Sequence, residues 1–210
     1  MTTIMLVRHG NTDWNAREIF RGRADVELNE TGIKQADLLA KYLEPMAMEA
    51  VYSSPLKRAF KTAEKVGATH HVDAIPCQEL IDFDYGEWQG LSHDTVRKRY
   101  RALYSEWLNS PHLARVPHGE SLDDVRKRVN RLVNQMIAKH KGTVLLVSHR
   151  VVHKVMICVL LGLDNSHFWN IRLDTCGITT FAHEKNSFVL VRHNDTSFLK
   201  PLGQTDLGDF

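Results

Sequence analysis

The hydrophobic positions of this chain form short continuous runs, separated by stretches in which apolar and polar residues recur with helical spacing. The runs are rich in β-branched residues, a composition typical of buried strands. They predict strands at Thr2–Val7, Ala50–Ser53, Thr143–Ser148, Ile178–Ala182 and Phe188–Arg192. Because the strands alternate with helices, we expect an α/β sheet that is covered on both faces.

Two stretches between these strands carry the periodicity of amphipathic helices. Their apolar residues are Ile33, Ala36, Ala40 and Leu43 in the first, and Leu122, Val125, Val129, Leu132 and Met136 in the second. Ser121 followed by Asp124 resembles a capping box and predicts a helix start. Ser54 followed by Pro55 predicts another start, with the serine as N-cap and the proline at the first helical position.

The length and apolar content of the chain predict one domain. A chain of 210 residues with 43% hydrophobic residues can bury one sizeable core, so we assign residues 1–210 to a single domain. The segment from about Ser92 to His118 is aromatic and basic and contains two prolines. We interpret it as an insertion, about residues 92–118, that covers the end of the sheet where the candidate site lies.

Charge and cysteine content disfavour several classes of function. The chain has 27 Lys and Arg against 25 Asp and Glu, so no overall charge attracts nucleic acid or an anionic membrane. Its three cysteines lack CxxC spacing, which disfavours a disulfide framework or a thiolate metal site and favours a cytoplasmic location. The most apolar runs are interrupted by charged residues and predict no membrane span. The basic run at 96–101 is interpreted as a solvated helix face.

Polar residues with candidate chemistry follow the predicted strands. Arg8, His9 and Gly10 come directly after the first strand, and His149 comes directly after the strand that ends at residue 148. Arg58 lies in the first turns of the helix after the second strand. Ligands of α/β sheets collect beyond the carboxyl ends of the strands, and arginine suits a bidentate contact with phosphate. Glycine at position 10 would let a ligand approach the backbone. The pattern therefore predicts a cationic pocket for one phosphoryl group.

Five motifs, in order along the chain, resemble those of the histidine phosphatase superfamily, also called the phosphoglycerate mutase-like family. They are LVRHGNTDWN, SSPLKRAFKTAE, GEWQG, PHGES and VSH, and they extend from residue 4 to about residue 182. The RHG motif combined with a late SH is specific to the family. The resemblance implies a three-layer α/β/α sandwich with a mostly parallel central sheet. It also implies a mechanism that passes through a phosphohistidine.

The resemblance also assigns roles to individual residues. His9 is expected to be the nucleophile. The phosphoryl oxygens are expected to be bound by Arg8, Arg58 and His149. Asn15, in the matched WN pair, is expected to add a polar contact, and Arg21 and Gly22 fall where the family often has residues near the substrate.

The proton donor is where the sequence departs from the family. The family usually has a glutamate four residues before the glycine of a GxWEG stretch, and here Asp82 lies four residues before Gly86. Aspartate is one methylene shorter, which removes roughly 1.5 Å of reach, and its reference pKa is about 3.9 against about 4.3 for glutamate. We therefore expect burial or neighbouring carboxylates to raise the pKa of Asp82. Asp84 and Glu79 are the reserve candidates.

Two further departures fall next to the motifs, and one pair of histidines suggests a metal alternative. Asn11 replaces the commoner glutamate after RHG, and Arg150 replaces the commoner glycine after SH; both are expected to tune substrate choice. His149 and His153 have the i, i+4 spacing of a zinc pair. HRVVH lacks the glutamate of HExxH, however, so no metal is assigned to the site.

These inferences predict a metal-independent phosphomonoester phosphatase that acts through a phosphohistidine on a small phosphorylated metabolite, without a cofactor. One alternative is a cofactor-dependent phosphoglycerate mutase-type phosphomutase. The long middle segment characteristic of the family's mutases is not found between residues 92 and 118, which favours hydrolysis. Another alternative is a non-enzymatic phosphate or protein binder on the same fold.

The substrate and the oligomeric state stay open at this point. Sugar phosphates, α-ribazole phosphate, phosphoglycerates and nucleotides all fit the superfamily. No sequence feature isolates an interface patch, so the oligomeric state is open, with a homodimer as one candidate.

Overall fold

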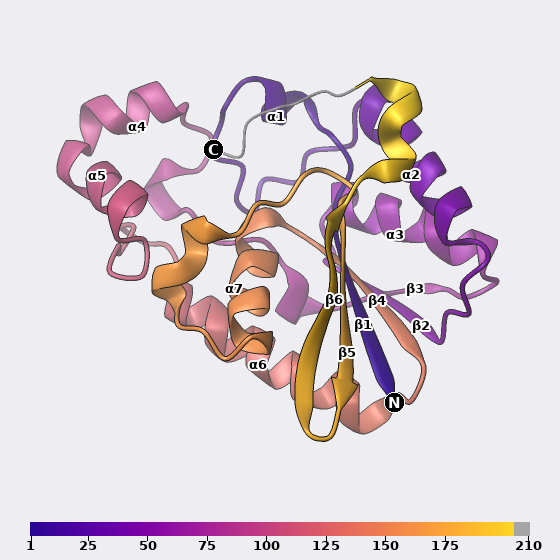
Figure 1. Cartoon of the computed structure of the whole chain (residues 1–210). Coiled ribbons are helices and arrows are strands. Elements are labelled where there is room, and N and C mark those ends of the chain that lie inside the picture. The colour runs from indigo at the N-terminus through magenta and orange to yellow at the C-terminus, as the bar shows by residue number, and fades with distance from the viewer. Residues whose placement is uncertain (204–210) are drawn as a thin grey trace.

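One six-stranded sheet forms the centre of the protein. The computed structural model describes residues 1–203, apart from the side chain of Ala16; residues 204–210 of the predicted domain lie outside the described part. The strands are β1 (Thr2–Arg8), β2 (Ala50–Ser53), β3 (Ala74–Pro76), β4 (Thr143–Ser148), β5 (Ile178–Glu184) and β6 (Ser187–Asp195). Their order is β3-β2-β4-β1-β5-β6 (Figure 1). The pairings among β3, β2, β4 and β1 are parallel, whereas β5 pairs antiparallel with both β1 and β6.

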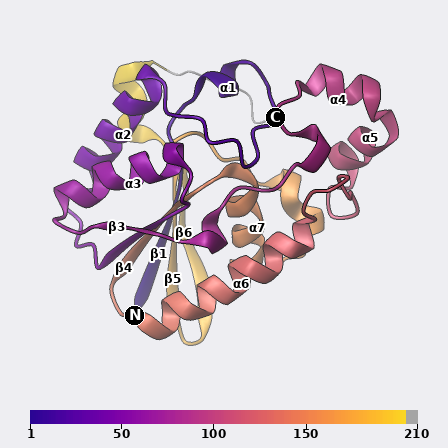
Figure 2. The same cartoon turned by 180° about the vertical axis from the view of Figure 1, so that it is seen from behind.

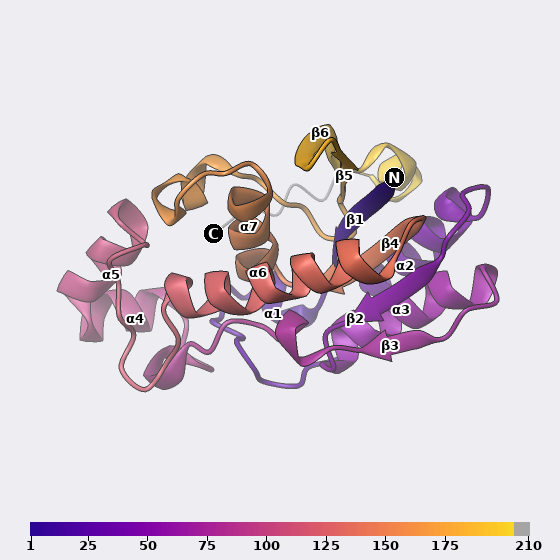
Figure 3. The ribbon, with the colours of Figure 1, turned by 90° about the horizontal axis from the view of Figure 1, so that it is seen from below.

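Helices cover both faces of this sheet. They are α1 (Asp13–Ala16), α2 (Glu30–Leu43), α3 (Lys57–Thr69), α4 (His93–Arg99), α5 (Arg101–Asn109), α6 (Leu122–Lys139) and α7 (Arg150–Leu160). Four short 3-10 turns are η1 (Gln78–Leu80), η2 (Gly86–Trp88), η3 (Asn165–Asn170) and η4 (Ser197–Leu202). Helices α2 and α3 lie on one face, and α6 and α7 lie on the other (Figures 2 and 3). This arrangement confirms the predicted three-layer α/β/α sandwich.

Alternation along β1 divides the core between the two faces. Ile4 and Leu6 pack with the residues of α6 and α7, whereas Met5 and Val7 pack with those of α2 and α3. All four side chains are buried, because a central strand has helices on both sides. The continuous apolar run in the sequence is therefore explained by burial on both faces.

The register of the parallel strands brings three polar strand ends together. Arg8 at the end of β1 pairs with Ser148 at the end of β4, and Ser53 at the end of β2 pairs with Val147. Parallel strands have their carboxyl ends at the same edge of a sheet, so the side chains that follow them share one crevice. His9, Ser54 and His149 are the residues that directly follow β1, β2 and β4.

The sequence predicted five of the six strands and missed β3. That strand has three residues, ends in Pro76 and is half-buried or exposed, so it lacks the long β-branched run of the others. The predicted start of α3 was also wrong. Helix α3 begins at Lys57, and its N-cap is Leu56, which makes no side-chain cap. Ser54 instead accepts a hydrogen bond from the Leu56 amide and contacts His149.

The segment 92–118, predicted to be an insertion, contains α4 and α5. Figures 1 and 2 show these helices beside the carboxyl end of the sheet, on the side away from the N-terminus. Trp107 of α5 is buried in an aromatic cluster with Trp88 of η2. The charged residues of the basic run, Arg97, Lys98 and Arg99, are exposed on α4, as expected of a solvated helix face.

Within residues 1–203, no helix combines the length and the apolar character needed to span a membrane.

We predict that Leu146→Ala destabilises the protein by about 2–5 kcal/mol, the usual range for truncating a buried leucine. Leu146 lies on central strand β4 and is fully buried. The matched control is Leu108→Ala on α5, where the side chain is 43% exposed and the change should stay within about 0.5 kcal/mol. Urea unfolding of the two variants measures the difference. Equal loss in both would contradict the placement of β4 at the centre of the core.

Candidate active site

His9 lies at the carboxyl end of β1 with its ring almost fully enclosed. Its Nδ1 is 2.7 Å from the Gly10 carbonyl oxygen. A carbonyl can only accept, so Nδ1 carries the proton and Nε2 keeps its lone pair. Burial and the charges of Arg58, Arg21 and Arg8 hold the pKa of His9 well below its usual 6.5. The ring is therefore neutral at cellular pH, with one nitrogen able to act as a nucleophile.

Three arginines supply the positive charge around this ring. Arg58, from the first turn of α3, is fully buried and donates to the Gly22 and Ala24 carbonyl oxygens at 2.9 and 2.8 Å. Arg8 donates to the Leu173 carbonyl oxygen. Burial and the neighbouring arginines lower the pKa of Arg21 to about 9, so it stays charged at neutral pH.

His149 faces His9 across the strand ends. The two ring centroids are 5.2 Å apart. The Nε2 atom of His149 is 2.8 Å from the Ser54 hydroxyl, which accepts at 3.3 Å from the Leu56 amide. Nδ1 lies 3.4 Å from a carboxylate oxygen of Asp82, which can only accept, so we place the ring proton on Nδ1 and the Ser54 hydroxyl as the donor to Nε2. Burial and Arg58 hold the pKa of His149 well below 6.5, so it is a neutral donor.

Ser54 is a site residue that the sequence analysis missed. The Ser-Pro dipeptide was interpreted as a helix cap, and a cap does not involve another strand end. The only feature that could have indicated its role is its position. Ser54 directly follows β2, which is parallel to β4 and adjacent to it, and His149 directly follows β4.

Asp82 contacts both Arg58 and His149. Its Oδ2 atom accepts from Arg58 Nη2 at 2.9 Å, and its Oδ1 atom accepts from the Phe83 amide at 2.8 Å. The expected neighbouring carboxylates are directed elsewhere. Asp84 forms an ion pair with Arg23 at 3.2 Å, and Glu79 accepts from the Cys77 thiol. The environment of Asp82 is thus an ion pair with arginine, not a group of acids.

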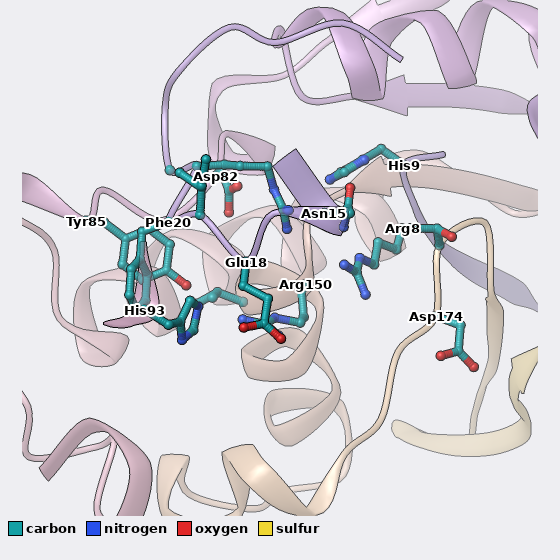
Figure 4. Close-up of a pocket in the computed structure, with 15 residues that line it drawn as sticks. Arg8, His9, Asn15, Glu18, Phe20, Asp82, Tyr85, His93, Arg150 and Asp174 are labelled. Carbon is teal, nitrogen blue, oxygen red and sulfur yellow. The ribbon is translucent and has the colours of Figure 1, made fainter. Parts of the chain in front are cut away.

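These side chains border one pocket, shown in Figure 4. Its polar walls come from Arg8, His9, Asn15, Glu18, Arg21, Gly22, Asp82, Tyr85, His93, Arg150 and Asp174. Six of the eight residues expected at the site line this pocket directly. The other two, Arg58 and His149, lie behind it and reach it through Asp82 and His9.

Two backbone hydrogen bonds hold residues 20–24, which we call the pocket loop, in place. The Phe20 amide donates to the Leu91 carbonyl, and the Gly90 amide donates to the Phe20 carbonyl, at 3.0 and 2.8 Å. Gly22 has φ +50°, and a Cβ there would lie 2.7 Å from the Gln89 side chain. The left-handed conformation therefore favours glycine at this position, and a larger residue would have to displace the Gln89 side chain.

Two expectations near the motifs change in the structure. Asn11 does not line the pocket, because its amide group accepts from Asn29 and its backbone donates to Gln35. Gly10 packs on the backbone of α2, where a Cβ would lie 2.6 Å from the Gly32 carbonyl oxygen. Its smallness therefore serves helix packing and not ligand approach. Arg150 does line the pocket, as its predicted role in substrate choice requires.

The histidine pair at i, i+4 has protein partners. His153 donates from Nε2 to the Val7 carbonyl oxygen at 3.0 Å, and Nε2 of His149 contacts Ser54.

Asn15 lines the pocket and also makes hydrogen bonds within the protein, since its side-chain oxygen accepts from the amide and the hydroxyl of Thr12. The Asn15 amide nitrogen is the donor left for the pocket.

Comparison with known proteins places this geometry in a family. The model of the histidine phosphatase superfamily (branch 1) matches residues 4–196. Phosphoserine phosphatase 1 of Hydrogenobacter thermophilus is 34% identical over 200 residues, covering 95% of each chain. The solved structure of YhfR from Bacillus stearothermophilus superposes with a TM-score of 0.91 at 29% identity, covering 95% of this chain and all of that one. A mycobacterial glucosyl-3-phosphoglycerate phosphatase gives a TM-score of 0.86 at 27% identity, covering 92% and 99%.

The neutral histidines predict a pH dependence of stability. His9, His149 and His153 all have a pKa below 6.5 in the folded state, that of His153 being about 4. Below pH 6.5 the unfolded chain binds protons that the folded one refuses, so stability falls as pH falls. Each histidine contributes up to about 1.4 kcal/mol per pH unit.

Urea unfolding at pH 7.5, 6.5 and 5.5 measures this slope, and His153→Gln should reduce it by the share of one histidine. A free energy of unfolding that stays constant or rises toward pH 5.5 would show that these rings are protonated in the folded protein.

We predict that Ser54→Ala releases the His149 tautomer. Without the serine proton, Nε2 of His149 loses its donor and the Nε2–H form becomes populated. Nitrogen-15 NMR of labelled histidine distinguishes the two forms. Ser53→Ala is the matched control, because the Ser53 hydroxyl donates to the Ser54 carbonyl and not to the ring. A wild-type His149 already protonated at Nε2 would refute the assignment.

Proposed function

The chain belongs to the histidine phosphatase superfamily, and we propose that it is a metal-independent phosphomonoester phosphatase acting through phospho-His9 on a small phosphorylated metabolite. The observation that carries the proposal is the state of His9. Its ring is neutral, its Nδ1 donates to the Gly10 carbonyl oxygen, and the positive charges of Arg58, Arg21 and Arg8 act on the ring. The phosphatase names of the relatives support the same reaction class.

In the first step, Nε2 of His9 attacks phosphorus, an N–P bond forms, and the ester P–O bond breaks. Arg8, Arg58 and Arg21 compensate the negative charge on the phosphoryl oxygens, and the Nδ1 proton of His149 is a further donor. These donors belong to a folded, largely buried cluster, so they need no reorganisation when the phosphoryl group arrives.

The leaving oxygen needs a proton, and Asp82 is the carboxyl group placed to supply it. Asp82 lines the pocket, and a phosphoryl group bound there would compete with its carboxylate for Arg58. Asp82 donates this proton as the ester bond breaks. It then takes a proton from the water that attacks phospho-His9, which breaks the N–P bond and restores the starting state.

The relatives bear on the choice between hydrolysis and mutase activity. Their printed names include phosphoserine phosphatase and glucosyl-3-phosphoglycerate phosphatase, but also a probable phosphoglycerate mutase of Cronobacter sakazakii at 28% identity. We favour hydrolysis because the side chain of Glu18, which lines the pocket, is exposed to solvent, and a mutase has to exclude water from its phosphohistidine. A cytoplasmic location without nucleic-acid or membrane partners remains part of the proposal, and a homodimer stays possible within it.

We predict phosphate release from phosphomonoesters in the presence of EDTA. His9→Ala should abolish release, because the nucleophile is lost. Asp82→Asn should lower kcat by about 10²–10⁴-fold, the usual contribution of general acid–base catalysis. A phosphate assay across pH 5 to 8 measures both, with 2-phosphoglycerate formation from 3-phosphoglycerate followed in parallel.

Asp84→Asn is the matched control, because Asp84 is two residues away and paired with Arg23 outside the pocket. Its kcat should stay within about twofold of the wild type. Release lost on EDTA treatment would refute metal independence. Interconversion of phosphoglycerates with little free phosphate would establish a mutase, and a folded protein silent in both assays would favour a binder.

A further inference from the structure

The end of the pocket away from His9 carries charges that phosphoryl transfer does not use. In Figure 4, Glu18, Arg150 and His93 lie toward this end, whereas His9 and Asn15 lie toward the other. Glu18 is an anion and Arg150 is a cation. The leaving group of a substrate bound here would therefore lie beside one negative and one positive side chain.

Glu18 is held toward the pocket by an unusual backbone conformation. Its φ is +49°, in the left-handed region that non-glycine residues rarely adopt. The His93 amide donates to its carbonyl oxygen at 3.1 Å, and the adjacent Ile19 forms a bridge to Ser92. Such conformations persist where surrounding contacts impose them, and they cluster at ligand sites. Among the residues that the structure describes, the Glu18 carboxylate has neither a hydrogen bond nor an ion-pair partner.

Arg150 is the positive group at this end. It begins α7, is largely buried, and its guanidinium carbon lies 5.9 Å from the centre of the Trp169 ring. Its charge acts on the residues around it. Burial, with Arg150 and Arg21, lowers the pKa of His93 to about 4.

His93 is therefore neutral and cannot add a positive charge at neutral pH. Its ring stacks on Phe20 with the centroids 4.1 Å apart, and Phe20 contacts Tyr85 edge-on. The surface near Glu18 and Arg150 is thus neutral and aromatic. Charge selectivity at this end of the pocket therefore depends on the Glu18 carboxylate and on the guanidinium of Arg150, with Arg21 as a second positive charge that also acts on His93.

We propose that the physiological substrate is a phosphorylated amino acid. With its phosphoryl group at His9, its carboxylate pairs with Arg150 and its ammonium pairs with Glu18. The guanidinium suits a carboxylate because it donates two parallel hydrogen bonds. A free carboxylate at the rim suits an ammonium, and it disfavours a substrate with further negative charge there. The inference rests on the proposed phosphatase function and deepens it.

Three phosphate esters test the inference because each lacks at most one group. O-phosphoserine has both an ammonium and a carboxylate, 3-phosphoglycerate has a hydroxyl in place of the ammonium, and O-phosphoethanolamine lacks the carboxylate. The wild type should show the highest kcat/KM for O-phosphoserine, by about tenfold or more over each of the others, as expected for losing one charge-assisted contact.

Each of two variants removes one of the charges that are proposed to recognise the substrate. Glu18→Gln should reduce the ratio of kcat/KM for O-phosphoserine to that for 3-phosphoglycerate by about tenfold. Arg150→Gln should reduce the ratio of O-phosphoserine to O-phosphoethanolamine similarly. Glu30→Gln, an exposed glutamate at the start of α2 and outside the pocket, is the control and should keep both wild-type ratios.

The outcomes separate this inference from the function on which it rests. Wild-type ratios near one, or ratios that Glu18→Gln and Arg150→Gln leave unchanged, would overturn the amino-acid substrate while phosphate release upheld the phosphatase. Release from p-nitrophenyl phosphate but from none of the three esters would do the same. Silence of folded protein toward all four would overturn both proposals.

Discussion

The buried guanidinium of Arg58 is the contact on which the site depends. It comes from α3, and it bonds at once to the Gly22 and Ala24 carbonyls and to the Asp82 carboxylate. Those partners belong to the pocket loop and to the segment after η1, so a single side chain sets the position of both. Losing one partner of a buried ion pair leaves an uncompensated charge in the interior. The walls of the pocket are therefore energetically coupled through this one residue.

The same concentration of positive charge decides the protonation of the histidines. Burial and the arginines both disfavour an imidazolium, so His9 and His149 are neutral. Charge does not choose between the two ring nitrogens, however. That choice comes from hydrogen bonds, with the Gly10 carbonyl accepting from His9 and the Ser54 hydroxyl donating to His149. Two identical side chains thus expose different ring nitrogens to the site because their hydrogen-bond partners differ.

Much of the fold could be predicted from local patterns, whereas the surroundings of particular site residues could not. Strand β1 was predictable because burial on both faces demands an unbroken apolar run. Strand β3 was not, since its three residues are ordered by pairing with β2 and not by their own composition. The motifs indicated Asp82, but not that it pairs with Arg58, 24 residues earlier in the chain, in place of the acids beside it. Ser54 was misread for the same reason, because its partner His149 is 95 residues away.

The sequence by itself determined the class of fold, and it predicted which residues come together around the pocket. Hydrophobic periodicity follows from burial along a single element, and the RHG and SH motifs lie directly at strand ends. Only the tertiary structure decided which nitrogen of His9 is free, what Asp82 contacts, and that Glu18 and Arg150 lie in one pocket. The physical reason is that protonation, hydrogen bonding and charge complementarity depend on distances of a few ångströms between residues far apart in the chain. Such distances exist only once strand order, register and loop conformation are in place.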